Sequence, residues 1–349
     1  MTEVIVYLDD NSTWTQAEIP WQNLTCINYA FGKISGTTIV PELKKIGLIN
    51  GLKRAHPELR TCLSIGGWST EGFSDGVATA ASRQALVASI VAYCQRYDFD
   101  GVDLDWEYPG MDLAGIKARP DDAAHFLAFV QALRQALDQA ENDHSRRYWL
   151  TAAIGAAKPL LDTMSPDDDY HYLDYLDFVN VMTYDLRGSW THEASHHTNL
   201  FSYGDTDFTA LSADQAVLNL LAKGVSPDKI VIGAASYSRD WFGFPSETTS
   251  GLGAVAATLG TATTDYNQLR QLIATHPEFY HWDEQAQAPY YFDGQRFSSF
   301  DDVRSIKAKA DYIRQHQLRG MMFWEYSLDH SGELLATAAA ELRAPNQGS

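Results

Sequence analysis

The chain has 349 residues, 45% of them hydrophobic, so it can bury a large core in one large domain or two small ones. Its formal net charge of −19 and its pI of about 4.8 disfavour nucleic acid and anionic membranes as partners. No stretch approaches the ~18 consecutive apolar residues of a membrane span.

The first residues and the cysteines say little about the cellular compartment of the protein. Residues 1–3 lead directly into a strand-like run, without the basic and apolar regions of a signal peptide. The chain is therefore expected to be cytosolic, exported by another route, or lacking its leader. Cys26, Cys62 and Cys94 are far apart and form no C-x-x-C pair, so we expect buried small hydrophobes rather than a disulfide framework or a metal site.

Strand-like apolar runs alternate with helix-like segments along the chain. Strands are expected at residues 4–7, 24–31, 63–67, 99–107, 148–153, 178–184, 229–237 and 319–324. Helices are expected at residues 42–55, 82–97, 120–137, 213–222 and 303–317, with Pro120 opening the third. Eight continuous apolar strands between helices predict an α/β fold, a parallel (β/α)8 TIM barrel.

One connection is too long for this pattern, because about 65 residues separate Tyr237 from Asp301. It contains Gly- and Thr-rich turns at 249–264, a short helix near 266–274 and a strand-like run at 288–292. We interpret it as a small α+β insertion between strand seven and its helix. The predicted domains are a barrel of residues 1–237 and 302–349 and an insertion of residues 238–301.

The fourth strand carries Asp103, Asp105 and Glu107, alternating with Val102, Leu104 and Trp106. Side chains two apart on a strand share a face, so three carboxylates lie roughly 6–7 Å apart. Each raises the pKa of the next, which can keep one carboxyl protonated near neutral pH as a general acid. A solvated edge strand and a site for a divalent cation are the alternatives.

Other polar and aromatic motifs are expected at strand ends, where barrels of this type build their active sites. Each has a structural alternative: a tight turn for the two glycines, a salt bridge for Arg239, and core packing for Trp324. Asp100 has the opposite parity to the acid row, so we interpret it as structural. The motifs are Ser64-Ile65-Gly66-Gly67-Trp68, Met182-Thr183-Tyr184-Asp185, Tyr237-Ser238-Arg239 and Met322-Phe323-Trp324-Glu325.

Residues 100–107 match the pattern D-G-x-D-x-D-x-E, which resembles the signature of family 18 glycoside hydrolases, the chitinases. The other four motifs resemble the S-x-G-G, M-x-Y-D, Y-x-R and W-E elements of that family. They occur in the family's order and extend over nearly the whole chain. The resemblance implies a glycosidase that cleaves β-1,4 linkages between N-acetylglucosamine units in chitin and chito-oligosaccharides.

The resemblance also implies residue roles in a retaining, substrate-assisted mechanism, in which the N-acetyl oxygen of the sugar attacks the anomeric carbon. Glu107 is the general acid and later the base, and Asp105 orients the acetamide. Asp103 shares a proton with Asp105, and Tyr184 donates its hydroxyl to the acetamide oxygen. The implied sugar-binding residues are Asp185, Met182, Trp324, Tyr237, Arg239, Trp68, Gly67 and Phe31; Trp68, Trp190 and Trp241 are candidate stacking platforms.

No metal or organic cofactor is implied. The expected partner is chitin or a chito-oligosaccharide, the expected state is a monomer, and the resemblance favours secretion, with a cytoplasmic location as the alternative. Two other functions stay open: an endo-β-N-acetylglucosaminidase acting on N-glycans, and a catalytically silent chitin-binding lectin.

Overall fold

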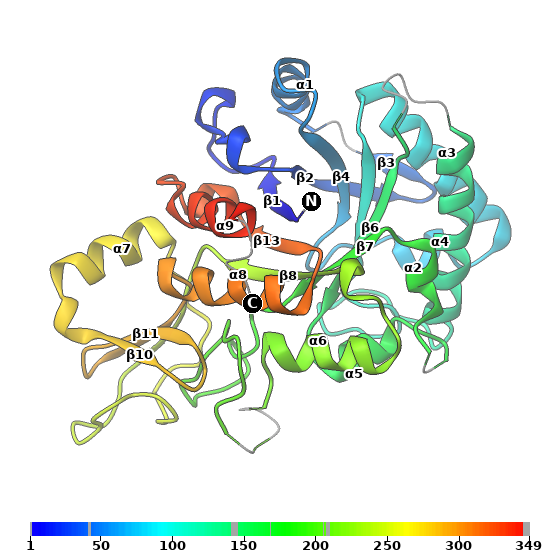
Figure 1. The fold of residues 1–349 in the computed structure, drawn as a ribbon. Coiled ribbons are helices and arrows are strands. Elements are labelled where there is room, and N and C mark those ends of the chain that lie inside the picture. The colour runs from blue at the N-terminus through cyan, green and yellow to red at the C-terminus, as the bar shows by residue number, and fades with distance from the viewer. Residues whose placement is uncertain are drawn as a thin grey trace.

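The computed structural model describes residues 2–40, 43–140, 146–167, 169–204, 206 and 210–344. Eight parallel strands form a closed barrel, because β1 pairs with both β13 and β2 (Figure 1). The barrel strands are β1 (Glu3–Asp9), β2 (Cys26–Ser35), β4 (Arg60–Gly66), β5 (Gly101–Asp105), β6 (Trp149–Gly155), β7 (Phe178–Met182), β8 (Ile230–Ala235) and β13 (Gly320–Trp324). The predicted (β/α)8 barrel is confirmed.

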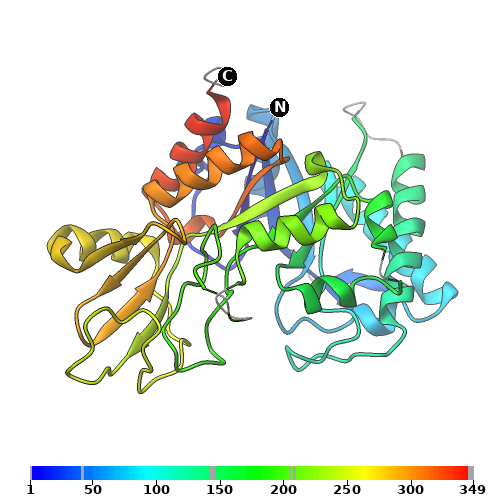
Figure 2. The ribbon, with the colours of Figure 1, turned by 60° about the horizontal axis from the view of Figure 1, so that its bottom comes forward.

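Helices cover the outside of the barrel, and their apolar faces pack on the buried strands (Figures 1 and 2). The helices are α1 (Ile46–Ala55), α2 (Phe73–Gly76), α3 (Ala80–Tyr97), α4 (Asp122–Gln139), α5 (Lys158–Thr163), α6 (Ala213–Ala222), α8 (Val303–His316) and α9 (Glu333–Arg343). Short 3-10 turns are η1 (Gln16–Glu18), η2 (Trp21–Asn23), η3 (His171–Tyr175), η4 (Pro227–Lys229), η5 (Pro277–Phe279) and η6 (Tyr326–Leu328). No helix in the described part of the chain is long and apolar enough to cross a membrane.

The first helix was predicted to start at residue 42, which was wrong. Helix α1 begins at Ile46, and residues 41–42 lie outside the described ranges. The amides of Lys44 and Lys45 donate to the carboxylate of Asp10, at 2.8 and 2.9 Å, so they form a turn before the helix. The short strand β3 (Thr38–Val40), which extends β2 as a hairpin, and helix α9 were not predicted.

A second, four-stranded antiparallel sheet follows β8, on the flank of the barrel opposite α3 and α4 (Figure 1). Its strands, in the order β10-β11-β12-β9, are β9 (Arg239–Phe242), β10 (Tyr280–Asp283), β11 (Ala288–Phe292) and β12 (Arg296–Ser299), with helix α7 (Tyr266–Thr275). The helix and β11 lie where they were expected. The division of the chain into two domains at residues 238–301 stays a prediction.

The loop that follows β7 packs against this second sheet. Ala194 joins its apolar core, which contains Trp241, Phe244, Phe292 and Phe297. Residues Glu193 and Val255 form an isolated β-bridge. The apolar core of the second sheet is therefore completed by a residue from a separate part of the chain.

Two of the sequence interpretations concern buried groups outside the active site. Asp100 is buried at the start of β5, where it pairs with Lys53 at 3.1 Å and accepts from the Thr61 amide at 2.9 Å, so its structural role is confirmed. The three cysteines are buried and free, as expected.

Helix α8 is attached to the barrel by a fully buried ion pair. Lys309 Nζ lies 2.7 Å from Asp301 Oδ2, and neither side chain is exposed. Asp301 also accepts from the amide of Ala235 and from the hydroxyls of Thr198 and Ser305. Because these partners come from β8, α8 and the loop after β7, the pair joins three parts of the structure.

We expect Lys309→Met to lower the free energy of unfolding by about 3–5 kcal/mol, because the Asp301 carboxylate would lose its counter-charge inside the protein. Denaturant unfolding measures this loss. Lys117→Ala is the matched control, since it removes a lysine from a half-exposed pair with Asp75, and it should cost less than about 1 kcal/mol. Equal losses in the two variants would contradict the assignment.

Candidate active site

Asp103 is the innermost acid of the row and is fully buried. Its two carboxyl oxygens accept four hydrogen bonds, each from a different strand. The donors are Tyr7 Oη (2.8 Å), Ser64 Oγ (2.8 Å), Thr151 Oγ1 (2.7 Å) and Asn180 Nδ2 (3.0 Å). Burial raises the pKa of Asp103, and these four donors partly offset that rise.

Asp105 and Glu107 continue the row outward. Burial raises the pKa of Asp105 well above its usual range, and the neighbouring charges of Glu107 and Asp103 raise it further. Burial also raises the pKa of Glu107, to about 7, with a smaller upward contribution from Asp185. Strand β5 lies between β4 and β6, so the alternative of a solvated edge strand is wrong. Both pKa shifts have the direction expected from the spacing.

The two glycines at the end of β4 allow it to approach this row closely. Gly66 and Gly67 both have positive φ, at 120° and 88°. A Cβ on Gly66 would collide with the carbonyl oxygen of Asp105, and one on Gly67 would lie 2.7 Å from the Phe31 ring. Both positions therefore require glycine.

Tyr184 follows β7 and lies over β8. A Cβ on Gly233 of β8 would be 2.7 Å from the Tyr184 ring, so this glycine makes room for the phenol. The Tyr184 hydroxyl is 3.7 Å from the sulfur of Met322. Burial and the charges of Asp105 and Glu107 raise the Tyr184 pKa well above its usual range, which keeps the phenol a hydrogen-bond donor at neutral pH.

Asp185, Tyr237 and Arg239 form a second group beside Tyr184. Arg239 Nε donates to Asp185 Oδ1 at 2.6 Å, so of the alternatives for this arginine the pairing with a site carboxylate is observed. Burial acts to raise the pKa of Asp185, but the hydrogen bond and the positive charge of Arg239 outweigh it and hold the pKa well below its usual range. The Tyr237 ring packs edge-on against Tyr184, at 6.3 Å between centroids.

Trp324 ends β13 and packs against two aromatic rings at the barrel centre. Its ring lies 5.6 Å from Tyr7 and 5.6 Å from Phe31, nearly parallel to the latter. Met182 packs against the same apolar cluster. The predicted residues in or directly after β2, β4, β5, β7, β8 and β13 therefore gather at the carboxyl ends of the barrel strands.

The three tryptophans proposed as stacking platforms have different environments. Trp68 and Trp190 are 59% and 56% exposed and remain available to a ligand. Trp241 is fully buried in the core of the second sheet, and its indole donates to the Thr191 carbonyl at 2.9 Å. The prediction for Trp241 was wrong, because β9 turns this side chain into its own sheet.

Several contacts of the site were not recognised from the sequence. Ser64 was placed in a strand-end motif without a role and Thr151 was not singled out, yet both lie directly opposite Asp103 in the barrel register, so strand pairing would have identified their contact with it. Tyr7 and Asn180 reach the same carboxyl from β1 and β7. His197, which contacts Asp185, lies in an irregular loop and gave no signal.

The arrangement places a carboxyl that is half-protonated near pH 7 beside a second carboxyl and a phenol donor, at the carboxyl end of a barrel. Such a group can protonate a leaving oxygen and then activate water, which is the chemistry of a glycoside hydrolase. Across the described ranges, no three His, Cys, Asp or Glu side chains converge as a metal site would require.

The model of the family "Glycosyl hydrolases family 18" matches residues 3–329, and the chain belongs to this family of glycoside hydrolases. It is 33% identical to Chitinase A1 of Niallia circulans over 86% of its length and 36% identical to mouse Chitotriosidase-1 over 80%. It spans 45% and 61% of those two relatives. A solved family 18 N-acetylglucosaminidase from Paenibacillus barengoltzii is 40% identical, with a TM-score of 0.89 over 98% of this chain and 100% of that one.

We expect Glu107→Gln to stabilise the fold at alkaline pH. The pKa of Glu107 is about 7 in the folded protein against 4.5 ordinarily, so the unfolded chain releases its proton first and stability falls as pH rises between these values. The variant removes this penalty, about 3 kcal/mol at pH 8 and less than about 1 kcal/mol at pH 5. Denaturant unfolding at the two pH values tests it, and a pH-independent difference would contradict it.

Proposed function

We propose that this enzyme is a chitinase that hydrolyses β-1,4 linkages between N-acetylglucosamine units in chitin and chito-oligosaccharides. The observation that carries the proposal is the acid row on β5, where burial holds the Glu107 carboxyl at a pKa of about 7 above two further carboxyls. The names of its relatives from Niallia circulans and mouse support the same substrate.

In this mechanism Glu107 donates its proton to the leaving glycosidic oxygen and later takes a proton from the attacking water. The acids on β5 share one face, so none lies on the far side of the sugar ring as a nucleophile. The acetamide oxygen of the substrate takes that place and forms an oxazolinium ion, with retention of configuration.

Asp105 orients the acetamide N–H and stabilises the positive charge that develops on the ring. Asp103 lies behind it and exchanges a proton with it, so the row titrates as a coupled system. The Tyr184 hydroxyl, held protonated by its raised pKa, donates to the acetamide oxygen. Its 3.7 Å contact with the Met322 sulfur is weak, so the Tyr184 hydroxyl can give up this contact and donate to the substrate.

The sugar in the central position would stack on Trp324, which packs against Tyr7 and Phe31. Asp185, Tyr237, Arg239 and Met182 would contact the same sugar from the ends of β7 and β8. Gly67 allows the chain to pass beside Phe31, and the exposed indoles of Trp68 and Trp190 would bind sugars further along the polymer.

A second candidate is an N-acetylglucosaminidase that removes single terminal sugars. The Paenibacillus barengoltzii enzyme named for that activity matches this chain from end to end, whereas Chitinase A1 and Chitotriosidase-1 are considerably longer. Both candidates cleave the same linkage, so the catalytic residues do not separate them. An endo-β-N-acetylglucosaminidase acting on N-glycans would share the linkage too.

We expect Glu107→Gln to lower kcat on a chromogenic chito-oligosaccharide by about a thousandfold or more while Kd for the unlabelled oligosaccharide stays within a few-fold, because the amide keeps the shape but has no proton to give. Initial rates and calorimetric binding measure the two effects. Asp112→Asn, an exposed acid in the loop that follows β5, is the control and should keep full activity. Substantial turnover by the Glu107 variant would remove Glu107 from the mechanism.

We expect a hexamer of N-acetylglucosamine to yield dimers and longer fragments among its first products, since two exposed indoles beside the site favour binding of several units. Mass spectrometry of early time points identifies them. Release of monomer alone would favour the N-acetylglucosaminidase, and cleavage of a glycoprotein N-glycan but not of the hexamer would favour the third activity.

A further inference from the structure

Asp185 has an unusual backbone conformation for a residue with a side chain. Its φ is 52°, in the left-handed region that a Cβ disfavours. It lies three residues beyond the end of β7, between Tyr184 and Leu186, and its side chain is 36% exposed. Such a conformation persists only where neighbouring groups hold it.

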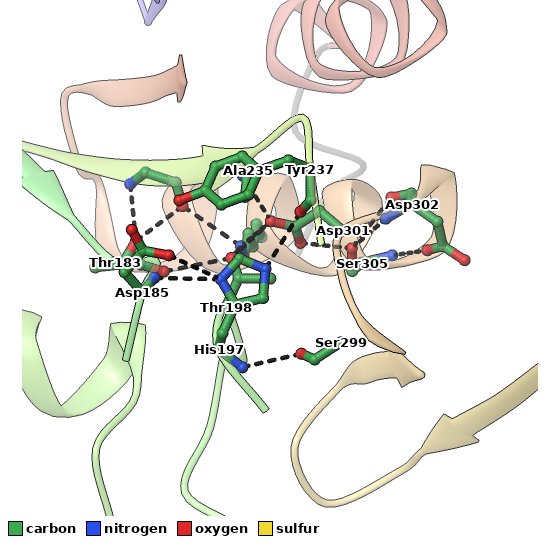
Figure 3. Close-up of polar contacts among 12 residues, drawn as sticks. Thr183, Asp185, His197, Thr198, Ala235, Tyr237, Ser299, Asp301, Asp302 and Ser305 are labelled. Atoms are coloured by element: carbon green, nitrogen blue, oxygen red, sulfur yellow. Dashed lines mark hydrogen bonds and ion pairs between the residues drawn. The ribbon is translucent and has the colours of Figure 1, made fainter. Parts of the chain in front are cut away.

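His197 supplies the groups that hold Asp185 in this conformation. The backbone amide of Asp185 donates to His197 Nδ1 at 3.2 Å (Figure 3). The next amide, of Leu186, donates to the His197 carbonyl at 3.0 Å. One residue thus binds two consecutive peptide groups, and it lies twelve positions from Asp185 along the chain.

The other ring nitrogen of His197 reaches the neighbouring strand end. Nε2 lies 3.3 Å from the Tyr237 carbonyl oxygen, and the two rings pack at 5.3 Å between centroids. A neutral ring with its proton on Nε2 satisfies both bonds, because Nδ1 then accepts and Nε2 donates. The Asp185 carboxylate lies 3.6 Å from Nδ1, outside hydrogen-bond distance. His197 therefore joins the segments that carry Asp185 and Tyr237.

The position of His197 is itself fixed from outside the barrel. Its ring is fully buried, and its backbone amide donates to Ser299 Oγ of β12 at 2.9 Å (Figure 3). The adjacent Thr198 donates to Asp301 at 2.7 Å and accepts from Lys309 at 2.8 Å. The second sheet and helix α8 thus determine where the ring lies.

We propose that His197 is a positioning residue for the hydrolytic reaction, which holds Asp185 and Tyr237 in register with the acid row. It acts through these two residues and does not touch the sugar. The proposal rests on the proposed sugar-binding roles of Asp185 and Tyr237, and it assigns to the loop after β7 a part in building the site.

Three variants test it on the oligosaccharide that the wild-type enzyme cleaves fastest. His197→Ala should lower kcat/KM by about 10–100-fold, since a displaced binding group costs this much. His197→Asn keeps an acceptor for the Asp185 amide in its Oδ1 but loses the donor to the Tyr237 carbonyl, so its loss should be about fivefold, smaller than that of His197→Ala. His197→Gln fills the space but places its amide at the Nε2 position, so it should lose nearly as much as His197→Ala.

The matched control is His196→Ala. His196 is the adjacent residue and equally buried, but its Nε2 faces Asp283 of β10 at 3.1 Å. This variant should keep kcat/KM within about threefold, with all assays run below the measured unfolding midpoints. Wild-type kcat/KM in His197→Gln, or equal losses in the His196 and His197 variants, would overturn the proposal.

A double-mutant cycle and a substrate-free measurement complete the test. In an Asp185→Ala background, His197→Ala should lower kcat/KM by clearly less than it does in the wild type, because one of the two groups it positions is already absent; an equal loss in both backgrounds would overturn the proposal. Nitrogen-15 NMR should show the Nε2–H tautomer of His197, and the Nδ1–H tautomer would contradict it. Because the NMR measurement needs no substrate, it tests the contacts of His197 even if the proposed function is wrong.

Discussion

The site depends on one buried carboxyl group at the axis of the barrel. Asp103 has no contact with solvent, and a carboxyl in such a place is costly unless its oxygens are hydrogen-bonded. Its four donors come from β1, β4, β6 and β7, so a shift of any one strand would remove one donor from the carboxyl and leave that hydroxyl or amide without its partner. The barrel must therefore close with these four strands in this register for the Asp103 carboxyl to keep its hydrogen bonds.

The electrostatics of the outer acids follow from this arrangement. Asp105 stands directly above Asp103 on the same face of β5, and its Oδ1 is buried without a hydrogen-bond partner. Burial and the charges on either side raise its pKa, while Lys33 opposes them. Glu107, beyond the strand end, is partly exposed and reaches a pKa of about 7. Asp103 has four donors, whereas one oxygen of Asp105 has no partner, so the row is less well hydrogen-bonded toward its middle, at a cost in stability that functional sites commonly carry.

The sequence predicts those features that follow from local periodicity. Eight buried strands appear as continuous apolar runs, and the two-residue spacing of the acids places them on one face. Strands β9, β10 and β12 have four residues each and no clear alternation, so nothing local marks them as a sheet. Trp241 could not be assigned for the same reason, since its burial depends on Ala194 and Phe297, which are far away in the chain. The contact of His197 with Tyr237 spans 40 residues and belongs to no repeating pattern.

The two halves of the site are held by different parts of the molecule. The acid row depends on side chains inside the barrel, through Asp103. The groups around Asp185 and Tyr237 depend on His197 and Thr198, and through them on Ser299 of the second sheet and the buried pair of Asp301 and Lys309 (Figure 3). Changes in the second sheet can therefore shift Asp185 and Tyr237 without disturbing the acid row. This separation lets one barrel keep its chemistry while the shape of its binding site varies.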